Sequence, residues 1–117
     1  MAGAGFDPNK TRIQQDTLAS FLRMPVSEDL STVPGIGAKN KEILGSGDDK
    51  VLTVHQLLGK FLSFKGPDVT PTEHCDAFYH WLAAKGVNSH RNNIVLAVAE
   101  KVEVFIPGVY DAAAYEP

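Results

Sequence analysis

The chain has 117 residues, of which 44% are hydrophobic and 21% are charged. This length and composition predict a single globular domain with a hydrophobic core of its own. The formal net charge of −3 argues against a protein that holds nucleic acid through a general positive field, although backbone amides and a few local cations could still bind a phosphate.

The sequence also bounds the compartment. No apolar run approaches the roughly 18 residues that a membrane-spanning helix needs, so we expect no membrane insertion. The opening residues, MAGAGFDPNK, lack a basic start followed by an apolar stretch, and we expect no signal peptide. The single cysteine, Cys75, excludes a disulfide framework within the chain and favours a reducing, intracellular compartment.

The N-terminal part of the chain predicts short helices separated by proline and glycine. Residues 1–9 are small and Gly-rich, which predicts a mobile segment. Apolar residues at helical spacing predict a first helix over about 9–22, which Pro25 ends. Ser27, as an N-cap, predicts a second short helix over 27–33.

The segment TVPGIGAKNKEIL, residues 32–44, leads a Pro-Gly-x-Gly turn directly into a helix predicted over 38–44. Glycines permit backbone angles that other residues resist. Ile36 is predicted to plug the turn into the core, so that the amides from Gly35 to Ala38 face outward at the helix N-terminus. Such a terminus favours an anion, and a DNA phosphate would fit it without any base being read. The alternative is a plain corner between two helices.

Two lysines follow this turn. Lys39 and Lys41 are expected in the first turn of the helix, which is the unfavourable end of the helix dipole for a cation. Their placement therefore favours a bound phosphate over a purely structural turn. The alternative for each is an ordinary solvated side chain.

Two helices are predicted between the first turn and residue 86. Thr53 and Gln56 have the spacing of a capping box and begin a helix whose apolar stripe contains Gly59. A glycine inside a helix costs about 1 kcal/mol relative to alanine, which suggests that another backbone comes close. Thr70, with a glutamate three residues later, begins the next helix, and Gly86 ends it.

A second glycine-containing turn, KGVNSHRNN, precedes the last predicted helix, which begins at Asn88 or Ser89 and ends before Pro107. Its polar residues could donate to a second phosphate; the alternative is a normal N-cap. These residues are Asn88, Ser89, His90 and Arg91. The elements together predict an all-α fold: a small bundle of five or six short helices in one domain over 10–107, with 108–117 as a tail that has no packing pattern.

Residues 32–105 resemble the barrier-to-autointegration factor family. The resemblance is carried, in matching order and approximate spacing, by VPGIGAKNKEIL, LLGKFLSF, CDAFYHWLAAKGVNSHRNN and the closing helix to Phe105. It implies a small helical protein with a helix-hairpin-helix motif of the SAM-like type. It also implies a homodimer that binds double-stranded DNA without sequence preference and bridges two duplexes.

The resemblance further implies roles for individual residues and partners. The hairpin would be Gly35, Ile36 and Gly37, and the second DNA contact would be Asn88, Ser89 and His90. The dimer interface would contain Leu58, Gly59, Phe61 and Leu62. Proteins of this family organise chromatin in the nucleus and bind LEM-domain proteins of the inner nuclear envelope. The nearest candidates for the family's N-terminal basic segment are Lys10, Thr11 and Arg12, and the C-terminal tail is an addition.

We expect no enzyme, no cofactor and no metal. His74, Cys75 and His80 are close in sequence but lack the paired spacing of a zinc site, and nothing orients Cys75 as a nucleophile. Asp68 follows KGP as in a DNA glycosylase, but it lies one helix too far from the hairpin. The main alternative is a helical protein-interaction module that has lost DNA binding, which the net charge favours.

Overall fold

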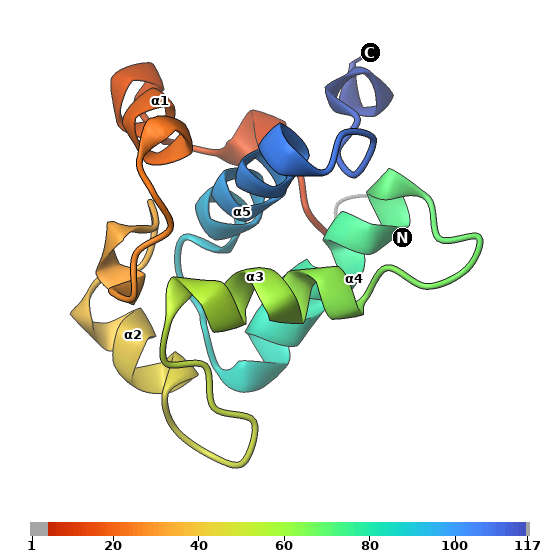
Figure 1. The fold of residues 1–117 in the computed structure, drawn as a ribbon. Coiled ribbons are helices and arrows are strands. Elements are labelled where there is room, and N and C mark those ends of the chain that lie inside the picture. Colours follow the sequence, from red (N-terminus) through yellow and green to blue (C-terminus); the bar gives the residue numbers. More distant parts are fainter. Residues whose placement is uncertain (1–4, 117) are drawn as a thin grey trace.

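The computed structural model describes residues 5–116, and within that range it contains helices and no strand (Figure 1). The elements are η1 (Pro8–Lys10), α1 (Gln15–Arg23), η2 (Leu30–Thr32), α2 (Ala38–Leu44), α3 (Val54–Ser63), α4 (Pro71–Lys85), α5 (Arg91–Phe105) and η3 (Ala112–Tyr115), where η marks a 3₁₀ helix. The all-α prediction is confirmed. None of the helices in the described range is long and apolar enough to cross a membrane.

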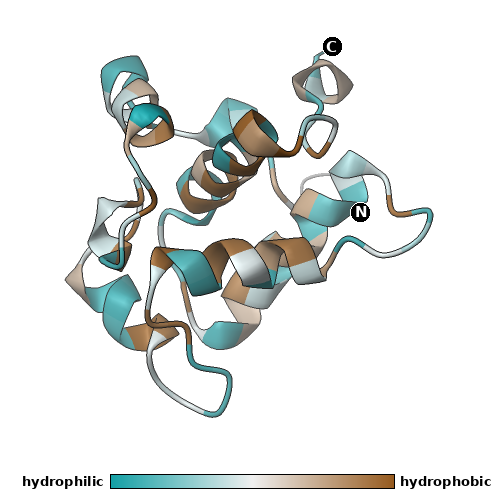
Figure 2. Ribbon diagram, viewed as in Figure 1, coloured by the Kyte–Doolittle hydropathy of each residue, from teal (hydrophilic) through white to brown (hydrophobic). Residues whose placement is uncertain are grey.

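The helix α5 lies at the centre of the bundle. It packs against α1, α3 and α4, and residues 94–99 are all buried. Figure 2 shows this helix as hydrophobic along most of its length, whereas α2 is largely hydrophilic. A helix that is apolar on every face is one surrounded by other elements. Because α5 is surrounded by other elements, several segments of the chain can meet at its first turn.

The predicted helix caps are largely confirmed. Thr70 and Glu73 form a reciprocal capping box at the start of α4, and Gly86 ends that helix with a left-handed φ of +105°. At α3, the Thr53 side chain accepts from the Gln56 amide as predicted. The Gln56 side chain, however, accepts from the amide of Leu52 rather than from that of Thr53.

The predicted helix over 9–22 is wrong in its first part. The structure has the 3₁₀ helix η1 there, followed by an extended stretch, and α1 begins only at Gln15. The reason is tertiary: the Arg12 amide donates to the Asn93 side chain at 2.9 Å instead of to a helix carbonyl. The expected mobile segment also differs, because Phe6 is only 5% exposed and packs in the core. Residues 1–4 of that segment lie outside the described residues.

Two other local predictions are corrected. The helix expected over 27–33 is only the single turn η2, capped by Asp29, and Pro34 then favours an extended Val33. The helix α5 begins not at Asn88 or Ser89 but after His90, which takes the left-handed region at φ +61° and makes no side-chain cap bond.

The C-terminal tail packs, although the sequence showed no pattern for it. Val109 is 6% exposed, and the Glu103 carboxylate accepts hydrogen bonds from the amides of Gly108 and Tyr110. Tyr110 and Tyr115 lie against the core. The tail is thus part of the folded domain, so the boundary predicted at 107 does not mark the end of the packed chain.

A buried histidine joins α3 to α4. His74 Nε2 donates to the Phe61 carbonyl at 2.6 Å, and the two rings stack with centroids 4.0 Å apart. Among residues 5–116 nothing is hydrogen-bonded to the buried Nδ1. Burial lowers the pKa of His74 below its usual 6.5, so the neutral ring is the form that fits the fold.

We predict that the free energy of unfolding falls as the pH drops from about 6.5 through the lower pKa of folded His74. The unfolded chain binds the proton first in that window, and each unit of separation between the two pKa values contributes about 1.4 kcal/mol. Urea titrations between about pH 7.5 and about pH 5 check this against His74→Phe, in which the pH dependence should be shallower. Equal slopes in the two proteins would contradict it.

Candidate nucleic-acid interface

The turn over residues 33–37 leads into α2 and packs against the start of α5. Gly35 has φ +99°, and a Cβ there would lie 2.9 Å from Ile94 Cγ1 and 3.1 Å from the His90 carbonyl oxygen. Glycine is therefore required at this position both by its backbone angle and by the close approach to α5. Ile36 is 4% exposed, so its predicted place in the core is confirmed.

Gly37 plays a different part in the turn. It is the N-cap of α2 with φ −94°, an angle open to any residue, and a Cβ there would meet nothing within 4 Å. No side chain caps the helix, so the amides of its first turn, from Ala38 to Asn40, have no acceptor within the helix. What glycine provides here is an unobstructed path from solvent to these amides.

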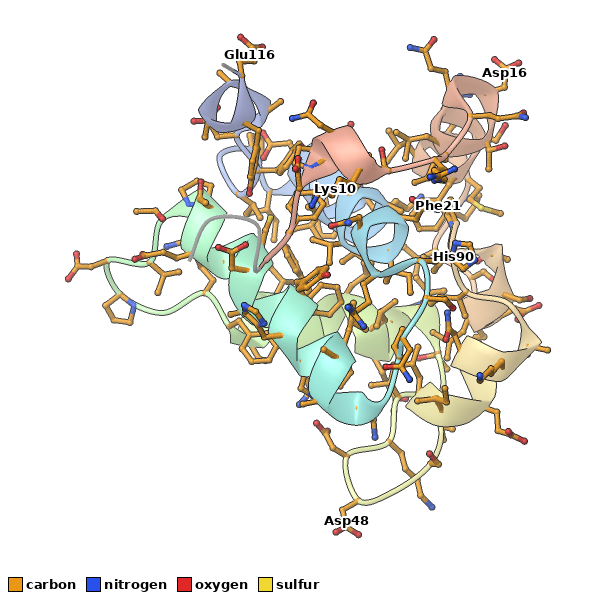
Figure 3. The ribbon with its side chains drawn as sticks, turned by 180° about the vertical axis from the view of Figure 1, so that it is seen from behind. Lys10, Asp16, Phe21, Asp48, His90 and Glu116 are labelled. Atoms are coloured by element: carbon orange, nitrogen blue, oxygen red, sulfur yellow. The ribbon has the colours of Figure 1, made fainter. Side chains whose placement is uncertain are left out.

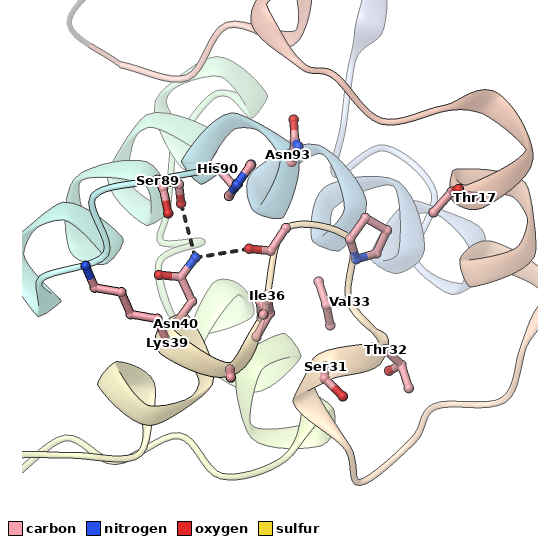
Figure 4. A pocket seen from close by; sticks show the side chains of 14 residues that line it. Thr17, Ser31, Thr32, Val33, Ile36, Lys39, Asn40, Ser89, His90 and Asn93 are labelled. Atoms are coloured by element: carbon pink, nitrogen blue, oxygen red, sulfur yellow. Dashed lines mark hydrogen bonds between the residues drawn. The ribbon is translucent and has the colours of Figure 1, made fainter.

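Asn40 ties this turn to the second one. Its side chain is 4% exposed, and Nδ2 donates to the carbonyl of Gly35 at 3.0 Å and to the carbonyl of Ser89 at 3.2 Å (Figure 4). One buried amide group thus holds together two loops that are separated by the whole of α3 and α4. The two turns that the sequence singled out independently lie side by side.

The two turns enclose an open cavity of about 570 Å³, which we call the hairpin cavity. Its lining combines polar side chains such as Asn40 and Ser89 with apolar ones such as Val33 and Ile36, and Lys39 is its one lysine (Figure 4). The residues are Thr17, Ser31, Thr32, Val33, Pro34, Gly35, Ile36, Gly37, Ala38, Lys39, Asn40, Ser89, His90 and Asn93. Of the ten predicted DNA-binding residues, seven lie in this lining: Gly35, Ile36, Gly37, Ala38, Lys39, Ser89 and His90.

A second cavity of about 290 Å³, the basic cavity, adjoins the first at His90 and Asn93. Its lining consists of Lys10, Arg12, Tyr79, Asn88, His90, Arg91, Asn92 and Asn93. Seen from behind, Lys10 and His90 lie near the same end of α5, far from the acidic loop that carries Asp48 (Figure 3).

The electrostatics of this surface differ from those of the whole chain. Lys10, Arg12, Lys39 and Arg91 bring four formal positive charges to the two linings, and neither lining contains an aspartate or glutamate. The net charge of −3 is therefore carried by other parts of the protein. Locally, the cavities combine cations with free backbone amides, which is a setting for an anion.

Two predicted DNA contacts bind other groups of the protein, and the predicted place of Lys41 in the first turn of its helix is wrong. Lys41 lies in the last turn of α2, outside both linings, with Nζ 3.1 Å from Asp29 Oδ1. Hydrogen bonds from Ser31 and then Lys41 lower the pKa of Asp29 to about 2. Arg91 reaches the basic cavity, but its guanidinium stacks 4.9 Å from the Tyr79 ring centroid and donates to the carbonyl oxygen of residue 87. It therefore fixes the loop as well as adding charge.

Sequence reasoning missed Asn40 and Asn93 as parts of this surface. Each joins segments distant in the chain: Asn40 the two turns, and Asn93 the N-terminal segment, through its bond to the Arg12 amide. An asparagine on a short polar helix has no local signal that it will be buried. Lys10 and Arg12 had appeared only as the nearest match to a basic segment of the resembling family.

The predicted dimer interface lies only partly on the surface. Leu58 and Phe61 are 6% and 0% exposed in the core of the single chain. Gly59 is exposed and Leu62 is half-buried. A Cβ on Gly59 would meet nothing within 4 Å, so within the described chain no other backbone accounts for this glycine.

The structure describes the surroundings of the cysteine that the sequence raised as a possible nucleophile. Cys75 is buried, and burial raises its pKa to about 12, which leaves almost no thiolate at neutral pH. Within residues 5–116 no group of three or more histidine, cysteine, aspartate or glutamate side chains is placed to hold a metal ion.

Comparison with known proteins gives no match to this chain among protein-family models, curated proteins or solved structures. The resemblance to the barrier-to-autointegration factor family therefore rests on the quoted sequence motifs alone, and the function has to be argued from the site.

Proposed function

We propose that this protein binds double-stranded DNA through the phosphate backbone, without sequence preference. The observation that carries the proposal is the pairing of the two cavities. One presents the open amides at the start of α2, the other presents Lys10 and Arg12, and no carboxylate lines either. Amides and cations are the groups that contact phosphate, and such contacts carry no sequence information.

We place neighbouring phosphates of one strand in the two adjoining cavities. One phosphate would accept hydrogen bonds from the amides around Gly37 and Ala38, with Lys39 beside it. The next would lie near Lys10 and Arg12, with His90 between the two. The hairpin cavity offers backbone amides and Lys39 to a phosphate, and contacts of that kind carry no sequence information.

The proposal extends to a homodimer that bridges two duplexes and organises chromatin in the nucleus, with LEM-domain proteins as candidate partners. A dimer formed over the exposed Gly59 on α3 would give each assembly two DNA sites. Light scattering on the pure protein tests this step, because a monomer at working concentration would remove the bridging mechanism but leave the single site.

Gly37→Asp is expected to weaken DNA binding by about 10- to 100-fold while the free energy of unfolding stays constant or rises by a few tenths of a kcal/mol. An N-cap aspartate would accept from the first-turn amides and stabilise α2, but it would occupy the phosphate site with a negative charge. A hydrogen bond to a charged group contributes about 1.5–3 kcal/mol, and 1.4 kcal/mol is a factor of ten in affinity. Mobility-shift titrations with random duplex DNA measure the change.

Two controls make this experiment specific. Gly37→Asn caps the same amides without a charge, so it should weaken binding less than the aspartate does. Lys41→Ala removes a cation that lies outside both cavities, so the salt dependence of DNA binding should be nearly unchanged. Lys10→Ala should reduce the magnitude of the slope of log affinity against log salt concentration, the log–log slope, by about 0.9. No shift by the wild-type protein at low salt would overturn the proposal and favour the protein-interaction module.

A further inference from the structure

We infer that the C-terminal residues 108–116 act as a clamp on the N-terminal segment 5–12, and thereby position Lys10 and Arg12 in the basic cavity. We call residues 108–116 the C-terminal clamp. Its positioning role rests on the proposed function, whereas the clamp itself can be tested without DNA. The contacts run from α5 through the clamp to the two cations.

The clamp is fastened to the end of α5 by one carboxylate. Glu103 accepts from the Gly108 amide through both oxygens, at 3.0 and 2.9 Å, and from the Tyr110 amide at 2.8 Å. Val109, between these two residues, is buried. The chain therefore turns directly after α5, and Tyr110 and Tyr115 lie back against the core, while residues 111–114 are exposed.

The clamp packs two tyrosines against Phe6. The Phe6 ring lies 5.4 Å from that of Tyr115 and 6.4 Å from that of Tyr110, edge to face in both cases. The two tyrosines stack with centroids 6.1 Å apart. Phe6 is 5% exposed, and since two of its aromatic neighbours belong to the clamp, the clamp supplies much of the burial that anchors the N-terminal segment.

Hydrogen bonds from backbone amides to side chains hold the rest of the N-terminal segment in place, as far as Arg12. The Phe6 amide donates to Asp76 at 2.9 Å and the Asp7 amide to Asn92 at 3.0 Å. The 3₁₀ helix η1 follows, and the Arg12 amide donates to Asn93 at 2.9 Å. The Lys10 and Arg12 side chains are exposed and are in no ion pair within residues 5–116, so their place depends on how firmly the backbone is held.

The test compares Tyr115→Ala with Tyr115→Phe. Tyr115 Oη is buried, and the polar groups that it meets belong to Thr72 and Cys75 on α4 rather than to the N-terminal segment. Phenylalanine keeps the ring that packs on Phe6 and should therefore leave the N-terminal segment in place. Trypsin cuts after Lys10 and Arg12, and we expect this cleavage to be roughly tenfold faster in Tyr115→Ala. Cleavage after Lys101, which is 5% exposed in the central helix α5, reports global unfolding in the same sample and should not accelerate.

DNA binding provides the readout that a merely structural role would not move. If the clamp positions the two cations, Tyr115→Ala should lower the magnitude of the log–log salt slope by about 0.9 for each phosphate that the protein no longer neutralises. Lys10→Ala and Arg12→Ala should each weaken binding in the wild type and have little further effect in the Tyr115→Ala background. Tyr115→Phe should retain the wild-type slope.

The outcomes separate this inference from the proposed function. Unchanged cleavage after Lys10 and Arg12 in Tyr115→Ala would overturn the clamp, whatever DNA does. Additive effects of Tyr115→Ala and Arg12→Ala on DNA affinity would overturn the positioning role. Absence of DNA binding by the wild-type protein would overturn the proposed function, and the cleavage result would still decide whether the clamp holds the N-terminal segment.

Discussion

Replacing Asn40 with alanine is expected to lower the free energy of unfolding by about 2–4 kcal/mol and to abolish DNA binding. The substitution leaves the carbonyls of Gly35 and Ser89 without the buried donor that now serves both. The two bonds are partly buried; leaving a buried polar group without a partner costs about 1–3 kcal/mol, and the missing side chain adds a small cavity. The two turns would lose their common tie, so the hairpin cavity would lose its shape.

Asn40→Asp tests the two hydrogen bonds without shortening the side chain, so no empty space is left in its place. It keeps the shape of the side chain but replaces the donor with a carboxylate that faces two carbonyl oxygens, so it should destabilise the protein at least as much as alanine does. Glu42→Ala, an exposed change in the same helix, should stay within about 0.5 kcal/mol of the wild type. Urea unfolding measures all three, and a stable Asn40→Ala would show that the turns hold together without this amide.

The helices and caps with strong local signals could be predicted from the sequence. The capping box at Thr70, the stop at Gly86 and the helix over 38–44 all follow from residues within a few positions of each other, and the structure agrees. Where a distant partner competes with the local signal, prediction fails. Arg12 gives its amide to α5 rather than to a first helix, which delays α1 to Gln15.

The two turns of the candidate site could be predicted from the sequence, but the residue that holds them together could not. The two glycine-containing turns were visible in the composition of their segments, and Ile36 was correctly placed in the core. Their meeting through Asn40 could not be predicted, because it depends on how α3 and α4 return the chain to the hairpin. The packing of the tail could not be predicted for a related reason. Its tyrosines pack against Phe6, at the other end of the sequence, and nothing local marks them as part of the core.

A second buried polar residue, Lys101, differs from Asn40 because it carries a charge, and burying that charge costs free energy. Lys101 is 5% exposed, and its Nζ donates to the carbonyls of Phe21, Leu22 and Met24 at the end of α1. The ammonium also lies 4.9 Å from the Phe21 ring centroid. Burial lowers the pKa of Lys101 because it disfavours the charged form, while the three carbonyls and the negative end of the helix dipole favour that form.

Lys101→Met is expected to destabilise the protein by about 2–3 kcal/mol, because the missing hydrogen bonds outweigh the charge that no longer has to be buried. Bonds to a charged donor contribute about 1.5–3 kcal/mol each, whereas replacing a buried ion with an apolar residue can recover several kcal/mol of desolvation. The carbonyls decide the balance: the chain turns away after α1, so they have no other donor in place.

Urea unfolding gives the total change, and hydrogen exchange in α1 should report loosening of that helix before the rest. Lys50→Met, at an exposed lysine, should have little effect. A more stable Lys101→Met would show that desolvation dominates and that the ammonium is not what holds α1 against α5.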